Sequence, residues 1–491
     1  MCPFFLRSIA IIATSCVLIP PGNSARAQHV RYDARSAQGQ QMLKIYADAV
    51  AKMKTIKDGD PDNWVFQWYT HSVQSTTNKS AAITATYGPN PSAFKDLAQA
   101  MWETCQAHHA GDDENNFLVW HRMYVYYFEQ IIRDVSGHKD FTLPYWNYSA
   151  KGADHGVIPP EFTRKDDPVF KSLYVEKRNP GVNAGQPIDH SSPGALNLDS
   201  LAECLYEPGN GRQGFNMRLD GGLHGNVHVL VGGPQNMGSV PWAAGDPIFW
   251  LHHCNIDRLW ASWNKAGRKN PALGGQFTFA QNRQKVVAEV KEWMDPETEK
   301  HGYCYDKLEP VPACPKTAEA VAAGTRKQLR IGAVKSKEIK LESGSAPTRV
   351  SVEPVAAEKG VEAQDFHERV KVLPAGKRVL LVLKGLRADA QPGVLYNLYL
   401  ELPEGAKGEK AAPHLVGSIN FFNAVAHGEA GHGKMEAKGP ERFEQFDITE
   451  LSKGLQGKGL LKAKPTVTIA PAGTQAEKAN PVIGEISIVE E

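Results

Sequence analysis

At 491 residues, 42% of them hydrophobic, the chain can bury a sizeable core and has room for two or more domains. Its 55 basic and 54 acidic residues nearly cancel, so the sequence shows no charge excess of the kind that binds nucleic acid or an acidic partner. We therefore expect function to depend on particular side chains rather than on overall charge.

The first 27 residues differ from the rest. Arg7 precedes an apolar run at residues 9–19, and Ala25-Arg26-Ala27 fits a small-residue cleavage site. Because the run is too short to span a bilayer, we expect a removed export signal at residues 1–27 and no membrane anchor. The mature protein is then expected in the periplasm or outside the cell.

Residues 30 to about 135 are predicted to be mostly helical. Apolar residues recur at helical spacing in residues 41–53, and an aromatic-rich stretch at residues 64–69 leads to His71. In residues 117–135 one helical stripe should direct His121 toward the core rather than toward water. The stripe consists of Phe117, His121, Tyr124, Phe128 and Ile131.

The remainder of the chain changes character twice. Residues 144 to about 210 are rich in Pro, Gly and Asp and predict long irregular segments, which in a compact domain usually wrap a site. Residues 315–337 predict a linker, which would close a first domain at residues 28–314. Residues 338–491 predict an antiparallel β-sandwich or jelly roll. Its expected strands are residues 338–342, 348–355, 378–383, 393–402, 416–423, 442–449, 466–469 and 485–489.

Five cysteines remain beyond the expected signal: Cys105, Cys204, Cys254, Cys304 and Cys314. An odd number in an exported protein leaves at least one thiol outside a disulfide. Cys304 and Cys314 are close enough in sequence to form one.

Histidines gather in the apolar and aromatic segments. His224 and His228 are four residues apart, so on a helix both imidazoles leave from one face. His252 and His253 are adjacent and should diverge by about 100°, so we expect only one of them to join the first two. With His71, His108, His109 and His121 there are enough uncharged ring nitrogens for two all-histidine triplets. Such sites fit a pair of copper ions better than zinc.

These segments carry a family resemblance. WHRMYVYYFE (residues 120–129) and DPIFWLHHCNIDRLW (residues 246–260) resemble the two copper-binding signatures of the tyrosinase, catechol oxidase and polyphenol oxidase family, and LPYWNY (residues 143–148) is also similar. The resemblance covers roughly residues 35–305. It implies a four-helix-bundle core that holds a dinuclear (type 3) copper centre, with O2 as co-substrate.

The resemblance also implies the ligands. His71, one of His108 and His109, and His121 would bind the first copper ion. His224, His228 and His253 would bind the second, with His252 as a near neighbour. The family's spacing between the second and third ligands of the first site does not fit here, so His108 and His109 both stay candidates. In some members a cysteine near this ligand forms a thioether; Cys105 is the candidate, and a buried free thiol is the alternative.

Four further positions bear on substrate. Members that hydroxylate monophenols often carry Asn directly after the first ligand of the second site, where this chain has Gly225. Asp220 matches a position where plant members carry an acid, and Val240 matches a gate residue above the copper. Phe249, within the second signature, is also a candidate. The small gate favours bulky phenols, whereas Gly225 argues against strong monophenol hydroxylation.

The C-terminal region resembles the additional domain of plant-type polyphenol oxidases through YNLYLELP (residues 396–403), GSINFF (residues 417–422) and RFEQFDIT (residues 442–449). In the family this domain shields the active site, so we expect a latent enzyme. The expected activity is oxidation of o-diphenols to o-quinones with reduction of O2 to water. Phenolic small molecules are the expected partners. Full tyrosinase activity, o-aminophenol oxidation and, less favoured, haemocyanin-like O2 carriage are the alternatives.

Overall fold

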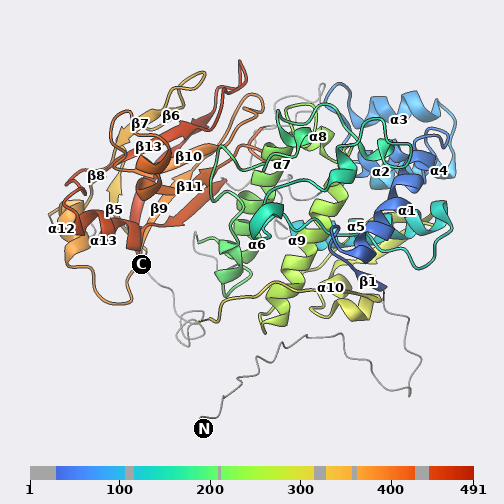
Figure 1. Ribbon diagram of the computed structural model, residues 1–491, viewed down its shortest axis with the longest axis horizontal. Coiled ribbons are helices and arrows are strands. Elements are labelled where there is room, and N and C mark those ends of the chain that lie inside the picture. The colour runs from blue at the N-terminus through green and yellow to red at the C-terminus, as the bar shows by residue number, and fades with distance from the viewer. Residues whose placement is uncertain (1–28, 106–115, 208–211, 315–327, 357–361, 426–441) are drawn as a thin grey trace, which may run out of the picture.

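The computed structural model describes residues 29–105, 116–207, 212–314, 328–356, 362–425 and 442–491. A helical region at residues 29–314 lies beside a β-region at residues 328–491, as Figure 1 shows. The sequence predicted this combination of an α-helical N-terminal part and an all-β C-terminal part, and the structure confirms it. The expected signal at residues 1–27 lies outside the described residues.

The helical region is built around four helices: α2 (Trp64–His71), α5 (Phe117–Ser136), α7 (Gly225–Val231) and α9 (Ile248–Lys265). The others are α1 (Ala37–Met53), α3 (Lys79–Tyr87), α4 (Ala93–Met101), α6 (Phe215–Arg218), α8 (Val240–Ala243) and α10 (Val290–Trp293). Every residue of α9 from Ile248 to Asn264 is buried, as expected for a helix that is surrounded by other elements. The hairpin β2 (Gln276–Gln281) and β3 (Gln284–Glu289) packs against α5.

Local sequence signals set the ends of these helices. Asn63 precedes α2, and its side chain accepts hydrogen bonds from the backbone N–H groups of Val65 and Phe66. Helix α5 ends at Gly137, whose φ of 79° is the left-handed conformation that closes many helices. Within these bounds, His71 is the last residue of α2 and His121 lies in the second turn of α5.

A buried ion-pair network fastens α5 to α9. Strand β1 (His29–Arg31) pairs in parallel with β4 (Tyr303–Tyr305), which directs Arg31 into the core. The Arg31 guanidinium donates to Glu129 of α5 and to Asp257 of α9, and Arg122 of α5 donates to Asp257 at 2.6 Å. Burial alone would raise the pKa of Asp257, but the two guanidinium groups outweigh it and hold that pKa below its usual value.

The predicted irregular stretch is present. Over residues 144–207 and 212–214, the described parts of this stretch, the chain forms turns, isolated bridges and short 3₁₀ segments without an α-helix. Arg178 anchors the stretch through a bidentate ion pair with Asp246, the residue that begins the second histidine signature. Because both partners are buried, this pair fixes the irregular segment against the start of α9.

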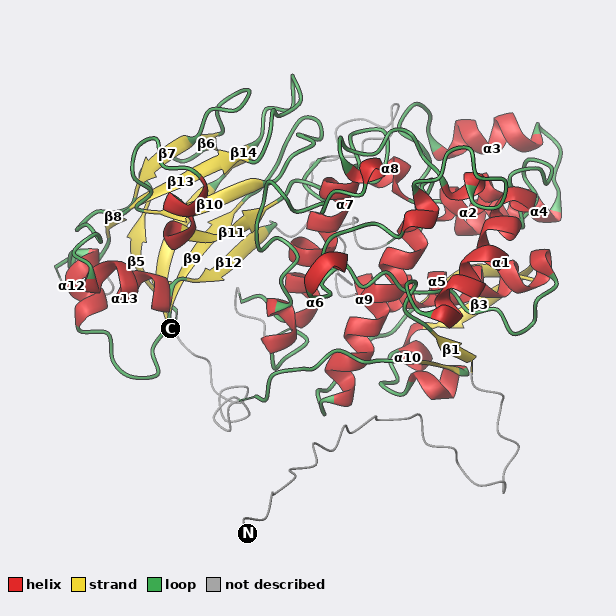
Figure 2. Ribbon diagram, in the orientation of Figure 1, coloured by secondary structure: helices red, strands yellow, loops and turns green. Residues whose placement is uncertain are grey.

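The C-terminal region consists of two main antiparallel sheets (Figure 2). Their strand orders are β11-β10-β13-β7 and β12-β9-β15-β5-β8. The bounds are β5 (Leu329–Ala333), β7 (Thr348–Ser351), β8 (Glu353–Pro354), β9 (Val379–Lys384), β10 (Tyr396–Leu400), β11 (Leu415–Ile419), β12 (Phe443–Asp447), β13 (Thr466–Pro471) and β15 (Glu485–Glu490). A small pair joins β6 (Ile339–Lys340) to β14 (Val482–Ile483).

All eight expected strand segments contain strands. The sequence prediction nevertheless missed some elements. Strand β5 lies within residues 315–337, the stretch that we expected to be a linker, and pairs with β15 near the chain's last described residues. Helices α12 (Phe366–Lys371) and α13 (Thr449–Gly457), which pack on each other, were also missed. A five-residue strand in an Ala/Lys/Gly-rich context gives little periodic signal, so only its pairing partner reveals it.

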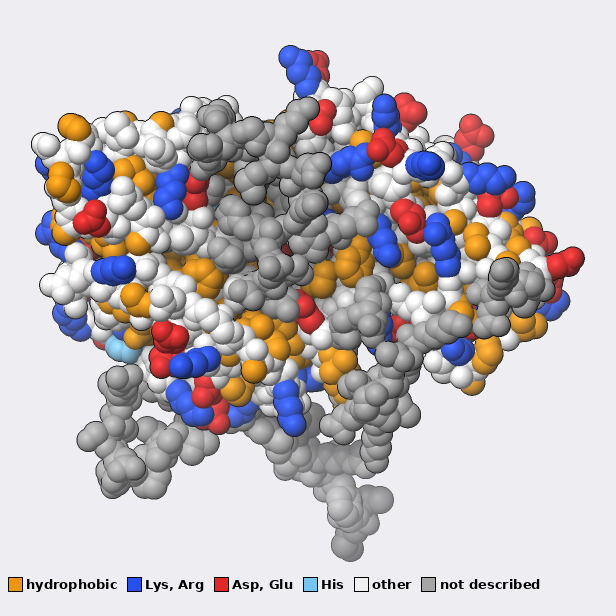
Figure 3. Space-filling model, turned by 180° about the vertical axis from the view of Figure 1, so that it is seen from behind, with side chains coloured by type: hydrophobic (Ala, Val, Ile, Leu, Met, Phe, Trp, Pro, Cys, Tyr) orange, Lys and Arg blue, Asp and Glu red, His pale blue; other side chains and the backbone are white. Residues whose placement is uncertain are grey.

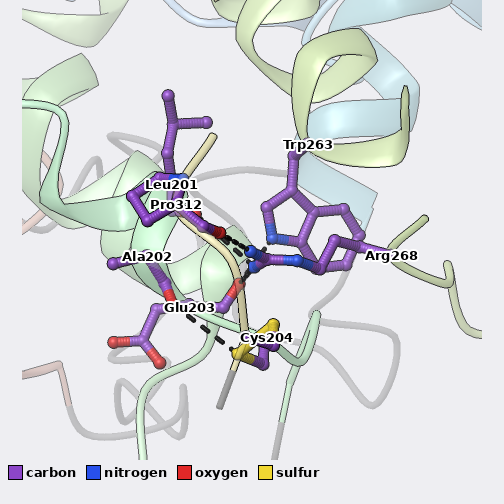
Figure 4. Close-up of a disulfide and its surroundings, with 8 residues drawn as sticks. Leu201, Ala202, Glu203, Cys204, Trp263, Arg268 and Pro312 are labelled. Atoms are coloured by element: carbon purple, nitrogen blue, oxygen red, sulfur yellow. Dashed lines mark hydrogen bonds between the residues drawn. A yellow bond between two sulfur atoms is a disulfide. The ribbon is translucent and has the colours of Figure 1, made fainter. Parts of the chain in front are cut away.

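The disulfide in the described structure joins Cys204 to Cys314, with Cα atoms 5.8 Å apart (Figure 4). The Cys304–Cys314 disulfide that their closeness in sequence suggested does not form, because Cys314 is bonded to Cys204 and Cys304 is buried in β4 outside any disulfide. Arg268 holds both sides of this junction through the carbonyl groups of Glu203 and Pro312. Proximity in sequence was a poor guide because β4 directs Cys304 into the core.

Basic and acidic side chains intermix over the face shown in Figure 3, in keeping with the near-zero net charge. Within the described residues, no helix combines the length and the apolar character needed to cross a membrane.

Candidate metal centre

Two groups of metal-ligating side chains lie inside the helical core. The first consists of His71 at the end of α2, His121 on α5 and Cys105, whose ligand atoms lie within 4.8 Å of one another. Cys105 is buried and outside any disulfide, and its Sγ lies 3.6 Å from Nε2 of His121. His108 and His109 lie outside the described residues, so the choice between them and the thioether hypothesis for Cys105 stay predictions.

The second group consists of His224, His228, His252 and His253, again within 4.8 Å of one another. His224 ends a π-helical turn at Leu219–His224 and His228 lies on α7, so the two rings meet edge to face with centroids 4.6 Å apart. The two groups adjoin each other, because the rings of His121 and His253 stack with centroids 4.1 Å apart and planes at 11°.

Both of the adjacent histidines lie next to His224 and His228, so the expectation that only His253 binds the second copper ion stays a prediction. His252 stacks parallel to His224 at 5.4 Å and meets His228 edge to face at 4.8 Å, while His253 lies 5.1 Å from His224. His224 and His228 thus both lie near two adjacent positions of α9. The 100° divergence of neighbouring side chains then places one imidazole on each side of the pair.

Backbone carbonyls orient three of the rings. Nδ1 of His121 lies 2.8 Å from the Phe117 carbonyl, and Nδ1 of His228 lies 2.8 Å from the Met237 carbonyl. Nδ1 of His224 lies 3.2 Å from the Asp220 carbonyl and 3.0 Å from its carboxylate Oδ1. When Nδ1 carries the donated proton, Nε2 keeps its lone pair for a metal ion.

The site is buried, and burial favours the neutral form of four of its imidazoles. Each of the six described histidines of the two groups is at most 2% exposed. Burial first, and neighbouring histidines second, lower the pKa of His121, His228 and His253 well below the ordinary value. For His252, burial and His224 have the same effect. Neutral imidazole is the form that binds metal ions.

The donor set fits a pair of copper ions. Among the described residues, Nε2 of His224, Nδ1 of His253 and both ring nitrogens of His252 have no hydrogen-bond partner although they are buried. Buried polar atoms without partners are costly, and a metal ion supplies the missing one for a ligating nitrogen. Imidazole-rich sites suit copper, and two adjoining groups suit two ions.

Three of the four substrate candidates border this centre. The ring of Phe249 lies 4.9 Å from that of His71 and 4.2 Å from that of His253, so it contacts both groups. Asp220 bonds His224, and Gly225 directly follows that ligand at the start of α7. Val240 is buried at the start of α8, whose Pro241 carbonyl accepts a hydrogen bond from Trp68 of α2. Its role as a gate stays a prediction.

The sequence prediction missed the residues that cover the centre. Phe422, which follows β11 in the β-region, stacks on His228 with centroids 4.1 Å apart and planes at 12°. It also meets His224 edge to face at 5.7 Å, and it belongs to the hydrophobic core of the helical region. The motif GSINFF drew attention to this stretch, but strand alternation does not predict where a side chain beyond the strand points.

A dinuclear site of buried histidines on four helices, next to an antiparallel β-region, defines the class of protein. The common central domain of tyrosinase matches residues 61–266, and a domain of unknown function (DUF7868) matches residues 329–491. The chain belongs to the tyrosinase family.

Individual relatives agree with this assignment. The chain is 31% identical over 221 residues to a tyrosinase of Streptomyces antibioticus, covering 40% of this chain and 78% of that one. It is 32% identical over 314 residues to tyrosinase HcTyr1 of Hahella sp. (strain CCB-MM4), covering 57% and 64% respectively. The match spans only about half to two thirds of the length of several curated relatives.

The fold as a whole also has a counterpart. A solved structure of a latent aurone synthase (polyphenol oxidase) superposes with a TM-score of 0.58 at 19% identity, covering 95% of this chain and 90% of that one. At this identity the likeness establishes the fold of both regions together.

Proposed function

We propose that this protein is a copper-dependent polyphenol oxidase that converts o-diphenols to o-quinones. Two diphenol molecules each lose two electrons and two protons, and one O2 takes up all four of each to give two molecules of water. The observation that carries the proposal is the pair of adjoining, buried histidine groups, joined by the stacked rings of His121 and His253.

The roles of the side chains follow from their positions. When bound, the copper pair supplies the redox couple and the place where O2 is reduced. His71, His121, His224, His228 and His253 would hold it, with His108 or His109 completing the first site. Phe249, which contacts both groups, offers an aromatic wall for a phenol ring. The Asp220 carboxylate orients His224 through Nδ1.

We further propose that the enzyme is latent and that the β-region is its cover. The face of His228 that a substrate would approach is filled by Phe422, and the histidines are at most 2% exposed. Gln213 of the helical region and Gln445 of β12 exchange two hydrogen bonds through each other's backbone N–H groups. A substrate the size of catechol can enter only after this interface opens.

Gly225 favours diphenols over monophenols as substrates. The position lacks a side chain that could orient a proton-accepting water, and the Asn420 amide fills the space beside it. A tyrosinase with full monophenolase activity and an o-aminophenol oxidase remain the alternatives that the test below separates. An O2 carrier would bind O2 without turning over a phenol.

Export is the location that we propose. The N-terminal segment predicts it, and the Cys204–Cys314 disulfide supports it because such bonds persist in oxidising compartments.

Oxygen uptake tests these proposals. Copper-loaded full-length protein is assayed with catechol and with phenol, before and after proteolysis within residues 315–327 and separation of the fragments. We expect slow catechol oxidation before cleavage, a rise of at least tenfold afterwards, and phenol turnover well below catechol turnover. Equal rates with phenol would establish monophenolase activity, and faster turnover of o-aminophenol would change the substrate class. Reversible O2 binding with no turnover would favour a carrier.

A further inference from the structure

The segment of the β-region that covers the centre also donates hydrogen bonds to the turn that ends in His224. We call Asn420–Asn423 the covering segment. Phe422 lies over the histidines, while the flanking asparagines contact Leu219–His224, the π-helical turn that ends in His224. π-Helical turns are rare, and this one is kinked because Gly222 has non-helical backbone angles (φ −87°, ψ −105°).

Asn423 acts through Asp220. Its Nδ2 donates to Oδ1 of Asp220 at 3.0 Å, and the same carboxylate oxygen lies 3.0 Å from Nδ1 of His224. The amide therefore fixes the carboxylate that orients the imidazole. Hydrogen-bond partners of this kind set the direction and basicity of a ligating ring.

Asn420 acts on the backbone of the same turn. Its Nδ2 donates to the Gly221 carbonyl at 2.7 Å and to Oδ1 of Asn226 at 2.8 Å, and it is fully buried. Arg442 donates to the same Gly221 carbonyl at 3.1 Å and to Oδ1 of Asn420 at 3.0 Å. Two side chains of the β-region thus satisfy a carbonyl three residues before His224.

The turn is shaped to receive these groups. A Cβ on Gly225 would lie 2.7 Å from Oδ1 of Asn420, and a Cβ on Gly221 would lie 2.5 Å from Oε1 of Glu444. Both glycines leave room for a side chain of the β-region. The turn and the β-region are therefore in close contact and joined by hydrogen bonds, whereas a segment that only blocked the centre would need neither.

We propose that Asn423, supported by Asn420, is a positioning residue for His224, so that the segment which blocks the centre also holds the geometry of the second copper site. This inference rests on the two-copper centre proposed above. It implies that displacing the β-region weakens the binding of one copper ion at the same time as it admits substrate.

Copper retention by the full-length chain tests the proposal. Copper-loaded protein is titrated with a chelator, and the copper bound per chain is counted at each concentration. We expect N423A to release one of its two ions at about tenfold lower chelator concentration, as is typical when a partner of a ligating histidine is lost. N423D should release this ion at a still lower chelator concentration than N423A, because a second carboxylate would face Asp220.

N397A is the matched control. Asn397 of β10 also reaches across the interface, donating to the Ser191 carbonyl at 3.2 Å, but it contacts no part of the turn in the described structure. We expect this variant to retain both ions as the parent does. Unfolding of the copper-free variants, followed by circular dichroism, shows whether N423A and N423D fold as the parent does.

Two outcomes would overturn the proposal. Retention of both ions by folded N423A and N423D, at parent chelator concentrations, would show that the contact with Asp220 does not position His224. An equal loss in N397A would show that general loosening of the interface is responsible. Neither readout depends on turnover, so a parent protein that binds two ions but oxidises no catechol would refute the proposed function alone.

Discussion

The phenyl ring of Phe422 lies flat against the imidazole of His228, although the two residues come from different regions of the chain and are 194 positions apart. Their ring centroids are 4.1 Å apart. An aromatic ring in this position fills the space that a flat phenolic ring would need in order to reach a metal ion at His228.

The size of residue 422 should therefore set the basal rate. We expect F422A to raise catechol oxidation by uncleaved protein at least tenfold, F422L to give an intermediate rise, and F422W to stay as slow as the parent. Oxygen uptake at saturating copper measures the series. Rates that do not follow side-chain size would place the block elsewhere.

Gly225 and Asn420 should be energetically coupled. In G225A the new methyl group would lie under 3 Å from the Asn420 amide, which must move and lose its hydrogen bonds. We expect G225A to destabilise the copper-free protein, but to add little in the N420A background. Denaturant unfolding of the four proteins should give a coupling free energy of about 1–2 kcal/mol. Additive effects would contradict the contact.

Asp257 should be a main support of the core, because it lies between Arg31 and Arg122. D257N leaves two buried guanidinium groups with one carboxylate partner fewer. We expect a loss of about 3–5 kcal/mol in the free energy of unfolding, the usual cost of breaking a buried ion pair from one side. D48N, which removes the exposed Asp48–Lys52 pair, is the control and should leave stability within experimental error.

The copper-free protein should lose stability as the pH falls. The pKa values of His121, His228, His252 and His253 are well below 6.5 in the folded state, whereas unfolded histidine has a pKa near 6.5. Below pH 6.5 the unfolded chain binds protons that the folded chain does not, so the stabilisation is complete above pH 6.5 and declines below it. Each histidine contributes up to about 1.4 kcal/mol per pH unit.

Urea unfolding between pH 8 and pH 5 measures this slope, and H252Q should reduce it by up to one proton. Burial raises the pKa of Asp62 to about 6, which acts in the opposite direction, so the series is best measured in a D62N background. A free energy of unfolding that does not change over this range would contradict the assignment of neutral buried imidazoles.

Residue spacing was enough to predict the direction of side chains within one helix, but not the contacts between segments that are distant in sequence. His121 is directed inward by the apolar stripe of α5, and His224 and His228 face one way because they are four positions apart. Both facts are local. The pairing of Cys204 with Cys314 depends instead on where β4 places Cys304, and the contact of Phe422 with His228 depends on how the helical region and the β-region meet.

His252 shows the same limit on a smaller scale. Helical geometry correctly implies that it diverges from His253, but the consequence depends on where α7 crosses α9. Nor does composition predict the π-helical turn before His224, because its support comes from Asn420, Asn423 and Arg442, about 200 positions further along the chain.

The disulfide between Cys204 and Cys314 fixes the end of the helical region immediately before residue 315. The β-region is joined to the helical region through the residues that follow Cys314, and β5 begins only at Leu329. Two parts of one chain that are linked over so few residues have an effective concentration on the order of millimolar, which favours the covered state over the open one. Cutting the chain between the two regions replaces this effective concentration by the actual concentration of the released fragment. The activity of cleaved enzyme should then increase on dilution, as for any complex of two separate chains.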